Sequence, residues 1–211
     1  MFIGHYAIAF LLILLFPQVP IWVPLVGVAF PDFLWGFLVL LKKEEVIIDS
    51  GSPLQKSIQF KRYPYSHSLV LTNAISFAVG AILAVSLGVP LVLPVFVFAS
   101  ASHWALDTLV HLHDLPVLGF DGDRKVGLGL WRRGSIAFVL ELALFVIFAA
   151  AFVRPLSVLL PVMAVGLVFH ATNANSFIGF SRKNPFPTPN AYAGVALAGF
   201  AAMSALLYVV I

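Results

Sequence analysis

Four ionisable residues between positions 103 and 114 recur at the spacing of an α-helix. They are His103, Asp107, His111 and Asp114. At about 100° per residue, they all fall within an arc of about 80° on one helical face. Imidazole and carboxylate groups at this spacing are suitable ligands for a divalent metal ion. The pattern therefore predicts a metal site to which His103, Asp107 and His111 contribute.

Three further residues could complete the ligand set from other parts of the chain. His5, Asp32 and His67 each lie within or at the start of an apolar stretch. Ionisable groups there are costly unless they face the protein interior and have a partner. With only nitrogen and oxygen ligands, we expect a divalent metal, with Zn as first choice and Mn, Fe or Ni as alternatives. The simpler interpretation is that these residues only form hydrogen bonds between helices.

Other polar residues are candidates for proton transfer and substrate binding. Glu141 and Asp114 could accept a proton from water, so we predict them as catalytic. Arg62 and Arg132 could bind a substrate phosphate through their guanidinium groups. The simpler role of both arginines is to set orientation and to contact lipid headgroups. His170 could join the site or bridge two helices.

The composition indicates what kind of protein must hold these residues. Of 211 residues, 61% are hydrophobic and only 10% are charged. The mean hydropathy is +1.03. A soluble domain of this size could not hide so much apolar surface from water, and a disordered chain would be far more polar. Cysteine is absent, which excludes disulfides and thiolate chemistry. The chain is therefore expected to be a polytopic membrane protein.

Seven apolar stretches approach the roughly 20 residues that a helix needs to cross a bilayer. They cover residues 2–16, 21–41, 67–87, 91–113, 135–153, 156–177 and 191–211. We predict an all-α protein, a bundle of about seven transmembrane helices, with a single transmembrane domain over residues 1–211.

The basic residues predict the orientation of these spans. All but one of the 12 Lys and Arg residues fall in the loops after the second, fourth and sixth stretches, and only Arg154 lies on the opposite side. The positive-inside rule then places the N-terminus and these loops in the cytoplasm. The candidate site residues would share the cytoplasmic half of the bundle. The expected partner is membrane lipid and not nucleic acid, and a homo-oligomer is left open.

Four short motifs carry a resemblance to a known family. Gly4-His5, Pro31-Asp32, Ser66-His67-Ser68 and His103-x-x-x-Asp107 occur in this order. The set resembles the integral-membrane metal-dependent hydrolases, a family that includes LexA-regulated inner-membrane hydrolases and has a distant likeness to zinc-dependent phospholipase C. The resemblance covers residues 4–114 and implies metal ligands at the matching positions and a prokaryotic inner membrane. Leu34 and Trp35 stand where the family often has Asp and His, so a two-metal site looks incomplete.

These observations lead to one expected function and two alternatives. The expected function is metal-dependent hydrolysis of a phospholipid or another membrane-associated ester or phosphoester by an activated water molecule. A metal-ion or proton transporter could use the same residues, although its path should place ionisable groups in both leaflets. A non-catalytic scaffold would use the cluster only to fix helix packing.

Overall fold

The protein is described by a computed structural model that covers residues 1–120 and 122–211. Its helices are α1 Tyr6–Leu15, α2 Trp22–Leu40, α3 Pro64–His67, α4 Leu69–Leu87, α5 Val92–Val110, α6 Gly134–Phe152, α7 Leu156–Thr172, α8 Ala174–Ile178 and α9 Pro189–Val210. Three short 3-10 helices are η1 Ile3–His5, η2 Gln55–Ser57 and η3 Leu130–Arg133. The prediction of a predominantly helical protein is confirmed, and the strands in the described residues are short.

Five helices are long and apolar enough to cross a membrane. They are α2, α4, α5, α6 together with η3, and α9. The other two apolar helices, Ile3–Leu15 and Leu156–Thr172, are shorter. At 1.5 Å per residue, Ile3–Leu15 extends only about 20 Å, against roughly 30 Å for the hydrocarbon core. Seven complete crossings and a cytoplasmic N-terminus therefore stay predictions.

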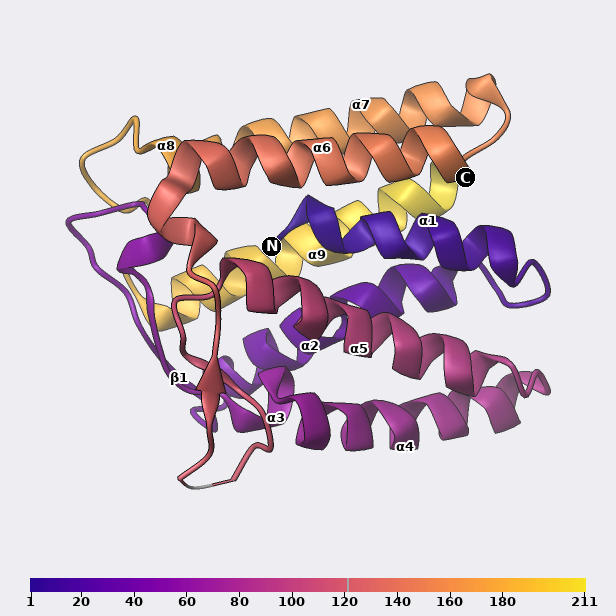
Figure 1. The fold of residues 1–211 in the computed structure, drawn as a ribbon, viewed down its shortest axis with the longest axis horizontal. Helices are drawn as coiled ribbons and strands as arrows, with labels where there is room; N and C mark the ends of the chain where they lie inside the picture. Colours follow the sequence, from indigo (N-terminus) through magenta and orange to yellow (C-terminus); the bar gives the residue numbers. More distant parts are fainter. Residues whose placement is uncertain (121) are drawn as a thin grey trace.

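The helices lie side by side in one bundle, with the longer loops gathered at one end (Figure 1). Helix α2 packs against α1, α5 and α9, while α6 packs against α1 and α7. Two small antiparallel sheets occupy the loop end. They pair β1 Glu45–Ile47 with β2 Gln59–Arg62, and β3 Leu115–Pro116 with β4 Lys125–Val126. This end carries the loops in which the sequence concentrates its basic residues.

Small residues allow α2 to approach its neighbours closely. A Cβ added at Gly27 would lie 2.8 Å from the Cβ of Ala99 on α5. A Cβ at Gly36 would lie 2.5 Å from Cγ of Leu197 on α9. Both distances are shorter than carbon–carbon contact allows. Glycine at these positions therefore brings Asp32, which lies between them on α2, close to both α5 and α9.

Two predicted helix boundaries differ from those in the structure. The predicted span 67–87 is broken at Ser68, whose extended backbone separates α3 from α4. The Ser68 hydroxyl accepts hydrogen bonds from the amides of Leu71 and Thr72 and so caps α4. The predicted span 91–113 ends at Val110, because His111 adopts an extended backbone. His111 and Asp114 therefore lie beyond the helix, not on its face.

Candidate metal centre

The carboxylate of Asp107 lies at the centre of a buried cluster of histidines. Asp107 is only 2% exposed. Its oxygens lie 3.2–3.7 Å from the Nε2 atoms of His103 (3.2 Å), His5 (3.3 Å), His111 (3.5 Å) and His67 (3.7 Å). The structure thus brings together residues from η1, α3, α5 and the segment after α5, as the sequence predicts.

Asp32 provides a second carboxylate on the side of the cluster that faces α2. Its oxygens lie 3.5 Å from Nε2 of His67 and 3.6 Å from Nε2 of His103. Pro31, which precedes it, lies inside α2 without breaking the helix. All six predicted metal ligands therefore belong to one cluster.

Hydrogen bonds on the outer side of the rings determine which nitrogens face inward. Nδ1 of His103 lies 2.7 Å from the carbonyl oxygen of Val28, and Nδ1 of His111 lies 2.9 Å from Oδ1 of Asp114. Because both partners accept, each Nδ1 must carry the proton that is donated. In the neutral ring, Nε2 then presents a lone pair toward Asp107, as a metal-binding histidine does.

Two of the ring nitrogens that point into this cluster have no hydrogen-bond partner in the described part of the chain. They are Nε2 of His5 and Nε2 of His103, both fully buried. A lone pair of His103 would face an oxygen of Asp107 at 3.2 Å with no proton between them. Buried polar groups are rarely left unpaired, and two electron-rich atoms at this distance repel each other. The ring nitrogens and the carboxylate oxygens, which all offer lone pairs, therefore fit a bound cation.

The N-terminal amino group also contacts the cluster. The Met1 nitrogen lies 2.6 Å from Oδ1 of Asp107, and this group is 5% exposed. An ammonium group beside Asp107 supplies the positive charge that a buried carboxylate needs. Sequence patterns contain no signal for this contact, because it depends on where the fold places a backbone group.

His67 is held by two residues that the sequence analysis missed in this role. The Ser66 hydroxyl lies 2.8 Å from Nδ1 of His67 and donates to Oε2 of Glu44 at 2.6 Å. Since the Ser66 proton goes to Glu44, its oxygen accepts the proton on Nδ1 of His67. Nε2 of His67 is then free to bind a metal. Oε1 of Glu44 accepts the amides of Tyr65 and Ser66 at 2.8 and 3.0 Å.

Glu44 is itself buried, with 4% of its surface exposed. Burial raises the pKa of its carboxyl to about 7, although the hydrogen bonds from Ser66 and Tyr65 and the charge of Arg62 act in the opposite direction. Its neighbour Glu45 is exposed. Nothing in the run Lys42-Lys43-Glu44-Glu45 distinguishes the two glutamates, because the β1–β2 hairpin decides which one points inward.

Glu141 and His170 do not belong to the cluster around Asp107. Oε1 of Glu141 accepts the backbone amides of Phe2 and Gly4 and so holds η1, which carries His5. His170 stacks on Phe138 with ring centroids 3.7 Å apart. Asp114 contacts His111 and not Asp107. Glu141 and Asp114 therefore act on the cluster through the histidines that they position.

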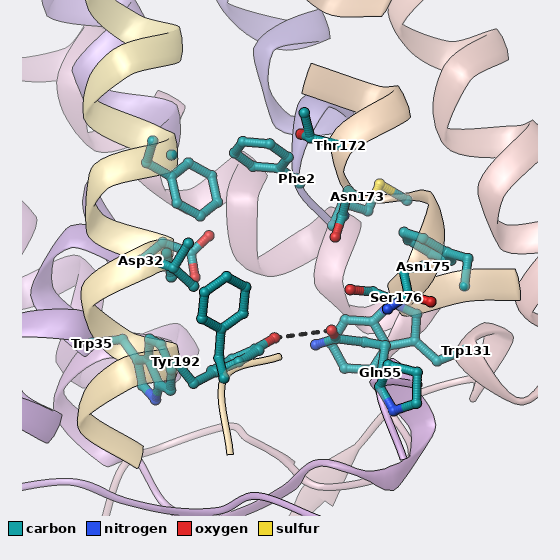
Figure 2. A pocket seen from close by; sticks show the side chains of 18 of the residues that line it. Phe2, Asp32, Trp35, Gln55, Trp131, Thr172, Asn173, Asn175, Ser176 and Tyr192 are labelled. Atoms are coloured by element: carbon teal, nitrogen blue, oxygen red, sulfur yellow. Dashed lines mark hydrogen bonds between the residues drawn. The ribbon is translucent and has the colours of Figure 1, made fainter. Parts of the chain in front are cut away.

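The metal-ligand cluster forms one end of a cavity of about 320 Å³. Asp32, His67, Asp107 and His111 line it, together with aromatic residues and amide side chains from α2, α8, α9 and the loops (Figure 2). Arg62 and Arg132 are both exposed, and neither lines this cavity. The predicted phosphate-binding arginines therefore lie outside the space that the cluster opens into.

Two overlapping groups of side chains have ligand atoms close enough together to hold an ion. One is His5, His103 and Asp107, and the other is Asp32, His67 and His103. Because both use His103, they form one centre. In the described residues His111 belongs to neither group, although it lines the cavity beside them. The chain matches no protein-family model, no curated protein and no solved structure, so these roles are assigned from the geometry of the site itself.

Proposed function

We propose that the protein is a membrane-embedded, metal-dependent hydrolase that cleaves a membrane-associated ester or phosphoester. The observation that carries this proposal is the convergence of histidine Nε2 atoms on Asp107, with Nδ1 of His67, His103 and His111 engaged by outer partners. A scaffold would need hydrogen bonds between helices, but it would not leave buried ring nitrogens of His5 and His103 unpaired.

The residues that would hold the ion are His5, Asp32, His67, His103 and Asp107. A divalent ion bound there supplies Lewis acidity, which activates water as a nucleophile and polarises the ester oxygen. Zn is the first choice for this nitrogen and oxygen ligand set, with Mn, Fe or Ni as alternatives.

His111 is the residue placed to move the proton. It lines the cavity, and Asp114 holds its Nδ1 at 2.9 Å. Nε2 of His111 accepts a proton from the attacking water as the new carbon–oxygen or phosphorus–oxygen bond forms. The same atom returns the proton to the oxygen of the leaving group when the ester bond breaks. The carboxylate of Asp114 stabilises the imidazolium between these two steps.

Elemental mass spectrometry of the purified protein tests the metal centre. We expect close to one equivalent of metal in the wild type and a loss of it in His103→Ala and Asp107→Ala. His113→Asn is the matched control, because His113 is exposed and has a positive φ of 75°, which asparagine tolerates. A protein that binds no Zn, Mn, Fe or Ni after reconstitution would overturn the proposal.

A second measurement tests the reaction. The metal-loaded protein is assayed with chromogenic short-chain carboxylic esters and phosphodiesters. We expect turnover that a chelator abolishes and that His111→Ala lowers by about 10²- to 10⁴-fold while metal content is kept. If the metal-loaded protein cleaved neither the carboxylic esters nor the phosphodiesters, the proposed hydrolase activity would be refuted and only a metal-binding site would be supported.

A further inference from the structure

The cavity beside the metal centre has two chemically different walls. Trp35 and Tyr192 form an aromatic wall on one side, with ring centroids 5.9 Å apart (Figure 2). Asn173, Asn175 and Ser176 lie across from them, at the junction of α7 and α8. An aromatic face opposite hydrogen-bonding side chains suits a ligand that has both an apolar surface and several polar atoms.

The charged groups of the cavity are confined to the metal end. Among the described lining residues, the acidic and basic groups are Asp32, Asp107, His67, His111 and the amino group of Met1. No lysine or arginine side chain belongs to the described lining. In the metal-free protein, the Met1 ammonium group lies beside Asp107, and no lysine or arginine side chain in the described lining offsets the second carboxylate, Asp32. This balance disfavours a ligand that brings a further negative charge into the rest of the metal-free cavity.

Two of the lining amides are fixed as hydrogen-bond donors. The oxygen of Gln55 accepts the Tyr192 hydroxyl at 2.9 Å (Figure 2). The oxygen of Asn175 accepts the backbone amide of Ser181, also at 2.9 Å. Among the described residues, the hydrogen bonds of these two side chains use only their oxygens, so their NH₂ groups can donate to a ligand. Such donors favour a ligand oxygen and disfavour a cation, because their hydrogens carry positive partial charge.

We propose that this cavity binds an uncharged, hydroxyl-bearing lipid head, which is either a sugar or a glycerol. The aromatic wall of Trp35 and Tyr192 packs against its carbon skeleton, and the amides of Gln55 and Asn175 donate to its oxygens. The placement of the scissile ester at the metal end rests on the proposed function. The recognition of the head is independent of the proposed hydrolase activity.

Apolar residues of the cavity lining provide the path for the lipid chain. Phe169, Val195, Gly199 and Phe200 line it, from α7 and α9. Val195 is 38% exposed, so the lining reaches the outer face of α9. A cavity of about 320 Å³ is near the lower limit of roughly 300 Å³ for ligand pockets, which is enough for a head but not for a whole lipid.

Binding of short amphiphiles with a common octyl chain tests the proposal. The protein is held in peptidiscs free of sugar detergent and stripped of metal with a chelator. Tryptophan fluorescence, to which Trp35 and Trp131 of the cavity contribute, reports binding. The ligands are octyl glucoside, 1-O-octylglycerol, octyl phosphate and octyltrimethylammonium. None of them is a carboxylic ester, so binding is measured without turnover.

We expect one of the two neutral ligands to bind at least about tenfold more tightly than octyl phosphate and octyltrimethylammonium. Which one binds more tightly distinguishes a sugar from a glycerol. Gln55→Ala with Asn175→Ala should weaken neutral binding about tenfold and leave octyl phosphate binding unchanged. Asn73→Ala is the matched control, since Asn73 is a half-buried amide on α4 that lies outside the cavity.

The proposal would be overturned if octyl phosphate or octyltrimethylammonium bound more tightly than both neutral ligands. It would also be overturned if the double variant bound the neutral ligands as tightly as the wild type. These outcomes are independent of catalysis. A protein that binds the neutral ligands but neither holds metal nor cleaves esters would refute the hydrolase and retain the head-group site.

Discussion

The imidazole rings of His5 and His103 lie nearly parallel, with centroids 3.6 Å apart and planes inclined by 10°. His5 belongs to η1 and His103 to α5, so the stack joins the start of the chain to the centre of the bundle. Both rings turn Nε2 toward Asp107, at 3.3 and 3.2 Å. The stack thus directs two potential metal-binding nitrogen atoms to one carboxylate.

Asp107→Asn should remove most of the metal affinity while preserving the shape of the side chain. The amide is neutral, so it no longer offsets the charge of the cation. We expect the affinity for Zn to fall by more than the 10- to 100-fold that loss of an outer partner typically costs. Chelator competition measures the change. Asp49→Asn is the control, because Asp49 is exposed and its Oδ1 only accepts the amide of Gly51. Equal affinity in the two variants would show that Asp107 is not a ligand.

Ser66→Ala should weaken metal binding without touching a ligand. The variant removes the acceptor that holds the proton on Nδ1 of His67 and leaves Glu44 without one of its donors. Loss of such an outer partner costs about 10- to 100-fold in metal affinity. Chelator competition at constant pH is again the measurement. If the thermal midpoint falls but the affinity is unchanged, Ser66 has a structural role only.

The stability of the protein should decrease as pH rises through the titration of Glu44. Its pKa is 4.5 without the fold and about 7 within it, so the folded state binds the proton more tightly. The resulting stabilisation is complete below pH 4.5 and is lost between pH 4.5 and 7, with an upper bound of about 3 kcal/mol. Thermal unfolding in detergent across this range measures the effect.

Glu44→Gln is the matched variant for this pH dependence. Its amide keeps an oxygen for the backbone amides of Tyr65 and Ser66, which Oε1 of Glu44 accepts in the wild type. It cannot titrate, so its midpoint should lack the component that the wild type loses between pH 4.5 and 7. Parallel pH profiles for the two proteins would contradict the assignment to Glu44.

Glu141→Ala should displace η1 and weaken metal binding, although Glu141 does not contact Asp107. The variant leaves the amides of Phe2 and Gly4 without their acceptor, at a cost of about 1–3 kcal/mol for each buried donor. Glu141→Gln retains an acceptor oxygen and should behave like the wild type. Thermal unfolding and metal content are measured together. If both variants keep the metal, η1 does not depend on Glu141.

The sequence predicted the ligand cluster better than the residues around it. His5, Asp32, His67, His103, Asp107 and His111 could be recognised because ionisable groups are rare in apolar segments, so each one is a signal. Their shared depth followed from the orientation of the spans. His111 was placed on the face of a helix, but it joins the cluster from the extended segment beyond Val110.

The outer partners could not be recognised, because they lie in polar loops where charged residues are ordinary. The burial of Glu44 depends on the pairing of β1 with β2. Arg62 and Arg132 also lie in polar loops, so their position in the fold could not be predicted. Their guanidinium groups could bind phosphate, but the fold leaves both side chains exposed. Trp35 is one of the apolar residues that follow Pro31-Asp32, and the structure places it in the lining of the cavity.

The metal-ligand groups and the asparagines of the cavity come from different parts of the chain. Every residue of the two candidate ligand groups lies between His5 and Asp107, whereas all three asparagines that line the cavity lie after position 170. If the proposed head-group site is correct, substitutions at these asparagines can alter which head is accepted without changing a ligand between His5 and Asp107. Such a division lets a family of proteins diversify in specificity while its reaction chemistry stays fixed.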